Sequence, residues 1–110
     1  MTQRFTVGAA LRAVAGSSDG EYAVLLAHGS MQLGYYKPDT TDRQKPHAQD
    51  EVYIVQSGSG TFVVHGEGRP FESGEALFVP AGAEHRFENF TNDFAAWVVF
   101  YGPRGGECAG

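Results

Sequence analysis

Short stretches in which apolar and polar residues alternate make up most of this chain, and turn residues separate them. In the clearest stretch, positions 51, 53 and 55 face one side of an extended segment, and positions 52 and 54 face the other. Ser-Gly-Ser-Gly at 57–60 follows as a hairpin turn, because glycine supplies the positive φ angles that tight turns need. Further extended segments are expected over residues 22–27, 32–37, 62–65, 75–79 and 97–101.

One segment near the start has a different pattern. Over residues 5–16, apolar side chains at positions 7, 10, 11 and 14 recur with helical spacing, which stops at Gly16. A short helix or turn is expected there. Fifteen glycines and five prolines, spread along the chain, fit many short strands joined by tight turns. The pattern therefore predicts an all-β protein with a short N-terminal helix or turn.

The last extended segment, residues 97–101, is apolar at every position, so both of its faces are expected to be buried. A small barrel has one interior. Apolar residues on its outside imply either a second layer of the same chain or a partner subunit. A homodimer is the simpler of these explanations.

Composition narrows the class of protein. With 110 residues the chain has the length of a single domain, 1–110, in which residues 102–110 are expected to form a flexible tail. The formal net charge of -5 argues against nucleic acid as a partner. A single cysteine, Cys108, excludes an intramolecular disulfide framework. The start lacks the apolar run of a secretory signal and no stretch is long enough to span a bilayer, so a cytoplasmic protein without membrane association is expected.

Two spaced motifs carry the candidate chemistry. The first has the spacing His47, three residues, Glu51, six residues, Gly58. The second has the spacing Gly74, five residues, Pro80, one residue, Gly82, two residues, His85, three residues, Asn89. Together they resemble the paired signature motifs of the cupin superfamily. That resemblance implies a jelly-roll β-barrel over about residues 33–101.

The motifs supply two imidazoles and a carboxylate from separate strands, a set that suits a divalent transition metal. His47, Glu51 and His85 are the candidate ligands, and Fe, Mn, Ni, Cu and Zn are all compatible with them. Glu51 is also a candidate catalytic base. Gln49 has the parity of His47 and Glu51, and we expect it to be a fourth, weak ligand or a hydrogen-bond donor to substrate.

The first motif departs from the family pattern at Lys45, which stands where an earlier histidine is usual. An ammonium group has no lone pair to donate to a metal. Two interpretations follow. Either the site uses only the other three ligands and Lys45 points outward, or Lys45 reaches the pocket as a counter-charge for an anionic substrate.

Other residues receive weaker assignments. His28 and His65 stand alone near turns, so they are expected to be ordinary surface histidines. An aromatic wall from Tyr53, Phe87 and Trp97 is expected to keep the substrate pocket dry.

The resemblance does not select one activity, since cupin barrels host many chemistries. The first hypothesis is a metal-dependent enzyme, dioxygenase-like or isomerase-like, that acts on a small oxygen-bearing molecule chelated at an open metal site. The second is a non-catalytic module that binds or senses a small ligand through the metal. A metal-free, lectin-like sugar binder is the third.

Overall fold

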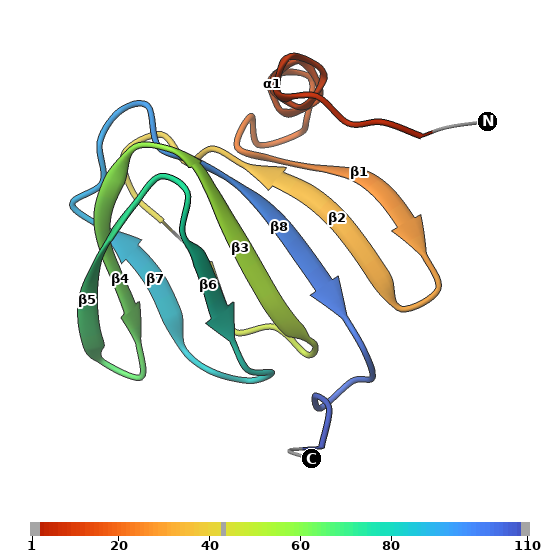
Figure 1. Ribbon diagram of the computed structural model, residues 1–110, viewed down its shortest axis with the longest axis vertical. Helices are drawn as coiled ribbons and strands as arrows, with labels where there is room; N and C mark the ends of the chain where they lie inside the picture. The colour runs from red at the N-terminus through yellow and green to blue at the C-terminus, as the bar shows by residue number, and fades with distance from the viewer. Residues whose placement is uncertain (1–2, 43, 109–110) are drawn as a thin grey trace.

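The computed structural model describes residues 3–42 and 44–108, which form one helix and eight strands. The elements are α1 (Val7–Ala15), β1 (Tyr22–His28), β2 (Met31–Tyr36), β3 (Asp50–Ser57), β4 (Ser59–Val64), β5 (Glu67–Glu72), β6 (Ala76–Val79), β7 (His85–Glu88) and β8 (Ala95–Tyr101). The strands pair in an antiparallel manner into a five-stranded sheet of order β1-β2-β8-β3-β6 and a three-stranded sheet of order β5-β4-β7 (Figure 1). The expected all-β jelly-roll architecture with a short N-terminal helix is confirmed.

The main hydrophobic core fills the space between the two sheets. Alternation along β3 sends Glu51, Tyr53 and Val55 into this interior, where all three are buried. The aromatic side chains that pack there are Tyr36, Tyr53, Phe62, Phe71, Phe87 and Phe94. The two sheets are thus held together largely by aromatic contacts.

A second, smaller cluster lies on the outer face of the five-stranded sheet, beneath α1. Ala10 and Val14 of the helix pack there against Tyr35 of β2 and Ala95 of β8, with Trp97 at the margin. Thr6 begins the helix, since its Oγ1 accepts a hydrogen bond of 3.2 Å from the amide of Ala9. A second layer from the same chain therefore covers part of the apolar outer face.

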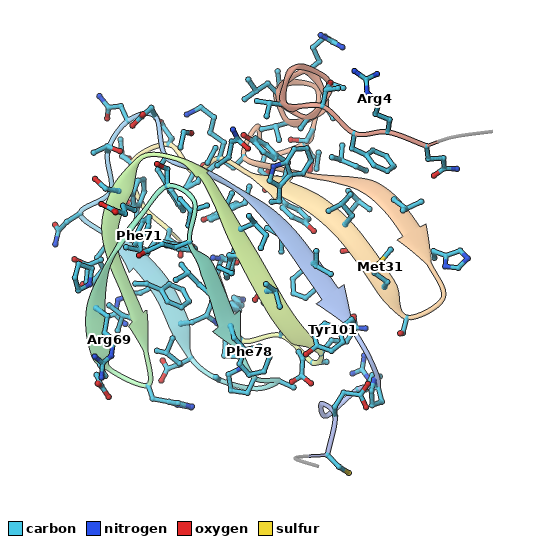
Figure 2. All side chains as sticks on the ribbon, in the orientation of Figure 1. Arg4, Met31, Arg69, Phe71, Phe78 and Tyr101 are labelled. Carbon is cyan, nitrogen blue, oxygen red and sulfur yellow. The ribbon has the colours of Figure 1, made fainter. Side chains whose placement is uncertain are left out.

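The helix leaves the far side of that outer face uncovered. Ile54 on β3 is 39% exposed and Phe78 on β6 is 54% exposed. Val52, which pairs with Phe78, is half-buried beside them. The side chain of Phe78 is labelled on β6 in Figure 2. Residues 97–101 are buried or half-buried on both faces, as expected, but α1 covers only the β1–β2–β8 side of the sheet.

No helix among the described residues is long and apolar enough to cross a membrane. The segment after β8, expected as a flexible tail, is hydrogen-bonded to the start of β3. The amide of Gly105 donates to the carbonyl of Ala48 (2.7 Å), and the amide of Glu107 donates to Oδ2 of Asp50 (2.8 Å).

Candidate metal centre

His47, Glu51 and His85 come from three different places in the fold and meet at one end of the interior. Glu51 lies on β3 between its neighbours β6 and β8, so it belongs to the five-stranded sheet. His85 begins β7 and pairs with Val64 of the three-stranded sheet. His47 lies in the loop that enters β3. The group therefore spans the gap between the two sheets.

Backbone hydrogen bonds at the corner before β7 connect the two motifs. Gly82 has a φ of 79°, in the left-handed region that favours glycine, and its amide donates to the carbonyl of His47 (2.8 Å). Asp50 holds the same corner, because its Oδ1 accepts from the amide of Ala81 (2.9 Å). The loop that carries His47 is thereby tied to the turn that aims His85 inward.

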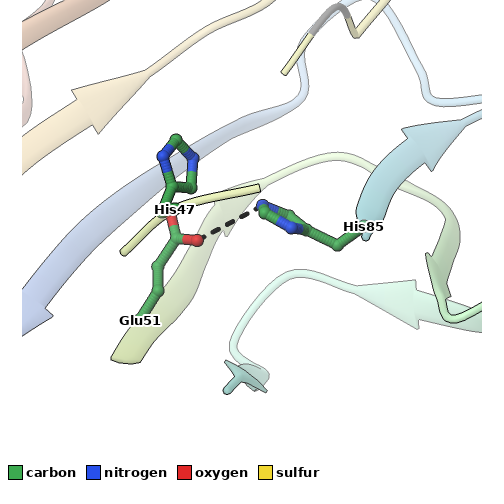
Figure 3. A group of neighbouring side chains, drawn as sticks. All are labelled: His47, Glu51 and His85. Atoms are coloured by element: carbon green, nitrogen blue, oxygen red, sulfur yellow. Dashed lines mark ion pairs between the residues drawn. The ribbon is translucent and has the colours of Figure 1, made fainter. Parts of the chain in front are cut away.

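The three side chains have the spacing of a metal-ligand set. One ligand atom from each lies within 4.8 Å of the other two, and Oε1 of Glu51 is 3.3 Å from Nε2 of His85 (Figure 3). Both carboxylate oxygens of Glu51 are buried and lack a well-formed hydrogen bond from the residues that the structure describes, and Oε1 has an ion-pair contact with Nε2 of His85 when that imidazole is protonated. Burying a carboxylate without donors is costly unless a cation compensates it. The donor set and this orphaned carboxylate therefore fit a metal ion.

His85 is oriented by a backbone contact. Its Nδ1 lies 2.9 Å from the carbonyl oxygen of Ala83, and a carbonyl can only accept, so Nδ1 carries a proton. Nε2 consequently points at Glu51 and at the hydroxyl of Tyr53, 3.2 Å away. Burial lowers the pKa of His85, but Glu51 and the Ala83 carbonyl raise it by more, so the pKa lies above its ordinary value. A metal at this site would replace the proton on Nε2.

The pKa of His47 is shifted in the opposite direction, below its ordinary value. Burial lowers its pKa and the nearby His85 lowers it further, which outweighs the attraction of Glu51. The imidazole of His47 is therefore neutral at neutral pH. A neutral imidazole has a free lone pair, which metal coordination requires.

Gln49 is not brought to this group. Its amide nitrogen donates to the carbonyls of Ser30 (2.7 Å) and Gly102 (2.9 Å), so it joins the β1–β2 turn to the end of β8. Parity does not predict the direction of Gln49, because residues 47–49 precede the strand and do not alternate as strand residues do.

Lys45 is exposed, which agrees with the interpretation that it points outward.

The expected aromatic wall is only partly placed at the site. Tyr53 is fully buried, with its hydroxyl beside His85, and Phe87 packs against Tyr53 in the core. Trp97 is on the opposite face of the sheet, where its ring contacts Tyr35 and its indole N–H donates to Gln56. Its parity on β8 is that of the outer residues, so the assignment of Trp97 to the pocket was wrong.

A cavity of about 560 Å³ opens onto His47 and Glu51. Its other lining residues come from β1, β2, β8 and the loops beside them: Asp19, Glu21, Tyr22, Gln32, Tyr36, Gln44, Val98 and Phe100. Tyr22, Tyr36 and Gln44 were not among the residues predicted for the site. Alternation places Tyr22 and Tyr36 on one face of their strands, but only the pairing of β2 with β8 brings that face to the motif residues.

His28 and His65 are exposed, as expected for surface histidines, and they lie outside the group of three candidate ligands.

Asn89, the last residue of the second motif, has a φ of 52°, and asparagine tolerates this left-handed conformation better than most residues. The spacing of the motif thus includes positions that shape the backbone as well as a position that supplies a candidate ligand.

Comparisons with known proteins agree with this architecture. A family model described as "Cupin domain" matches residues 32–101. An uncharacterized protein of Streptomyces coelicolor is 42% identical over 95 residues, which cover 84% of this chain and 90% of that protein. An acireductone dioxygenase of Gluconacetobacter diazotrophicus is 37% identical over 59 residues, but these cover only 49% of this chain and 33% of the dioxygenase. The crystal structure of a Cupin 2 conserved barrel domain protein from Salinispora arenicola superposes with a TM-score of 0.66 at 20% identity, covering 93% of this chain and 89% of that one.

Proposed function

The chain belongs to the cupin domain family, and from that premise we propose that it binds a divalent transition metal through His47, Glu51 and His85. The observation that carries this proposal is the buried carboxylate of Glu51, whose oxygens lack a well-formed hydrogen bond from the described residues and which has an imidazole nitrogen 3.3 Å away as a co-ligand. Nitrogen and oxygen donors without thiolate favour Fe, Mn, Ni, Cu or Zn over Ca²⁺ and Mg²⁺.

We further propose that the protein is a metal-dependent enzyme, dioxygenase-like or isomerase-like, whose substrate is a small oxygen-bearing molecule. The bound metal would act as a Lewis acid or as a site for dioxygen activation. Residues of the chain would supply the binding surface and the proton acceptor. Val98 and Phe100 make one wall of the cavity apolar, which suits the carbon skeleton of a small substrate, and Glu51 offers a carboxylate that can accept a proton from the substrate. The partial similarity to an acireductone dioxygenase supports the oxygenase form of the proposal.

The test is dioxygen uptake by the iron-loaded protein, with an acireductone as the first substrate. We expect turnover by the wild type and none by His85→Ala, because that variant loses a proposed metal ligand. His65→Ala is the matched control, since His65 is exposed and outside the group, and it should retain full activity. Circular dichroism checks that both variants fold.

Metal binding without turnover would favour the alternative, a non-catalytic module that binds or senses a small ligand through its metal. In that case dioxygen uptake stays at the background level for the acireductone and for other chelating substrates, whereas ligand binding still requires the metal. Ligand binding that survives chelation of the metal would contradict both forms of the proposal and would favour a metal-free sugar binder.

We also propose that the protein is a homodimer whose interface includes the uncovered outer face of β3 and β6. Ile54 and Phe78 support this proposal, because they leave a contiguous apolar area exposed beside the half-buried Val52. Light scattering after gel filtration tests it. Ile54→Glu with Phe78→Glu should give a monomer, whereas Leu11→Glu on the exposed side of α1 should not. A wild-type protein that is monomeric at micromolar concentration would contradict it.

A further inference from the structure

The loop that leads into β3 brings a fourth polar side chain, Gln44, to the ligand group. Its Oε1 lies 3.4 Å from Nε2 of His47 and 2.7 Å from the hydroxyl oxygen of Tyr53, which in turn is 3.2 Å from Nε2 of His85. Gln44 also lines the cavity together with His47 and Glu51. An amide oxygen therefore lies at the same end of the interior as the two imidazoles and the carboxylate.

The orientation of this amide is set by its neighbours. Nε2 of Gln44 donates to Oδ2 of Asp42 (3.0 Å), and the backbone amide of Gln44 donates to Oδ1 of the same carboxylate (3.0 Å). Because a carboxylate only accepts, the nitrogen of the amide must face Asp42 and its oxygen must face the site. Asp42 is itself held in place, since it accepts from the hydroxyl of Tyr36 (2.7 Å) and from the amide of Phe87 (2.8 Å).

The distances match those between neighbouring ligands of one ion. Two ligand atoms that are each about 2.1 Å from a metal are about 3.0 Å apart at a right angle and about 3.4 Å apart at a tetrahedral angle. The separation of Gln44 Oε1 from His47 Nε2 is 3.4 Å, and that of Glu51 Oε1 from His85 Nε2 is 3.3 Å. The amide oxygen has two lone pairs, of which Tyr53 occupies one, so the other remains for a cation.

We propose that Oε1 of Gln44 is the fourth protein ligand of the metal held by His47, Glu51 and His85. This inference rests on the proposed metal site, and it assigns to Gln44 the role that parity had suggested for Gln49. The alternative is that Oε1 only accepts a hydrogen bond from His47 and holds its ring. The two roles differ in a measurable way, because a ligand changes the coordination number of the metal and a hydrogen-bond acceptor does not.

Cobalt(II) is a suitable probe, since its visible absorption reports coordination number and its affinity can be measured against a chelator. For Gln44→Leu we expect Co²⁺ affinity to fall by at least about 10-fold, the loss that removal of a merely positioning residue would also give. The visible spectrum decides between the two roles, and we expect it to indicate fewer ligands. Gln49→Leu is the matched control, and Lys45→Ala is a second one. Both side chains lie away from the group, so both variants should bind Co²⁺ with the wild-type affinity and spectrum.

The outcomes separate this inference from the metal site itself. A wild type that binds no Co²⁺ would overturn the proposed function. A wild type that binds Co²⁺ while Gln44→Leu gives the same spectrum would overturn only the role of Gln44 as a ligand. A crystal structure of the cobalt-loaded wild type decides the matter without any variant. Oε1 of Gln44 is expected at about 2.1 Å from the ion, and a separation beyond about 3 Å would refute the inference.

Discussion

Two glycines of the signature motifs have the same kind of backbone angle but different surroundings. Gly58 has a φ of 85° and Gly74 a φ of 91°, so both are in the left-handed region. A Cβ at position 58 would lie 2.6 Å from the Cα of Phe94 and 2.6 Å from Oγ1 of Thr91, whereas one at position 74 would meet nothing within 4 Å. Gly58 is therefore needed both for its backbone angle and for the close approach of two chain segments.

This difference predicts unequal costs of substitution. Gly74→Ala should lower the free energy of unfolding by about 1 kcal/mol, since only backbone strain is added. Gly58→Ala should lower it by about 3 kcal/mol or more, because the clash with the Phe94 backbone adds to the strain. Urea denaturation of the two variants measures both values. Equal losses would show that the segment at Phe94 moves aside without cost.

Asp50 predicts a pH dependence of stability. The amides of Glu107 and Ala81 donate to its carboxylate and lower its pKa below the ordinary value of 3.8. A lowered folded-state pKa stabilises the fold above pH 3.8, and this contribution is lost as the pH falls through the folded-state pKa. Asp50→Asn should therefore be less stable than the wild type at pH 7, and the difference should shrink below pH 3.8. Urea midpoints across this range test the sign. A difference that is constant with pH would rule out the carboxylate charge as its cause.

At the scale of elements, the residues that pack the helix and the residues that form the candidate metal centre lie on different faces of the five-stranded sheet. The helix buries Ala10 and Val14 against the outer face of the five-stranded sheet, while the ligand group lies on the inner face. Strand β8 contributes side chains to both faces of this sheet. Its Val98 and Phe100 line the cavity, and its Trp97 packs on the helix side. Packing and ligand geometry are thus located on opposite faces of one sheet.

A substitution in α1 should separate stability from metal binding. Val14→Ala removes buried methyl groups from the outer cluster, so it should lower the free energy of unfolding by about 1–3 kcal/mol. Metal affinity of the folded protein should not change, because Val14 packs on the outer face of the sheet whereas Glu51 points to its inner face. Chemical denaturation and chelator competition measure the two quantities. Weaker metal binding by Val14→Ala would mean that the helix positions the site through the sheet.

For the molecule as a whole, the site links the two sheets, since Glu51 comes from one and His85 from the other. An ion held between them binds only the folded arrangement of the chain. Ligand binding to the native state alone stabilises a protein in proportion to the logarithm of the free ligand concentration. The proposed metal should therefore act as a clamp across the core.

Thermal and chemical unfolding with added Zn²⁺ or Ni²⁺ test this clamp. A metal at 100 times its Kd should raise the free energy of unfolding by about 2.7 kcal/mol. His85→Ala should show no such rise, and Mg²⁺ should have little effect on the wild type because it prefers all-oxygen ligands. A similar stabilisation of the His85→Ala variant would place the metal elsewhere on the protein.

Local patterns in the sequence were sufficient for α1, for six of the eight strands and for the candidate ligands that lie in or next to strands, but they did not identify β5 or β7 as strands. Alternation from Glu51 onward identified β3 and its inward face, and helical spacing that stops at Gly16 identified α1. The spacing of the second motif, with glycine and proline at a corner, indicated that His85 follows a turn. These features depend on neighbours along the chain, so they can be read without knowing which strands pair.

The tertiary structure decided the rest, because it depends on contacts between residues far apart in the sequence. Gln49 shares the parity of His47, yet it lies in a loop where parity has no meaning, and Gln44 takes the place beside the ligands because Asp42 holds its amide. Trp97 and Val98 are adjacent and both apolar, and the register of β8 on β3, which pairs Val98 with Tyr53 and Trp97 with Ile54, determines which of them faces the interior. Loop conformation and the choice of a buried face follow from long-range packing, which a periodic pattern does not contain.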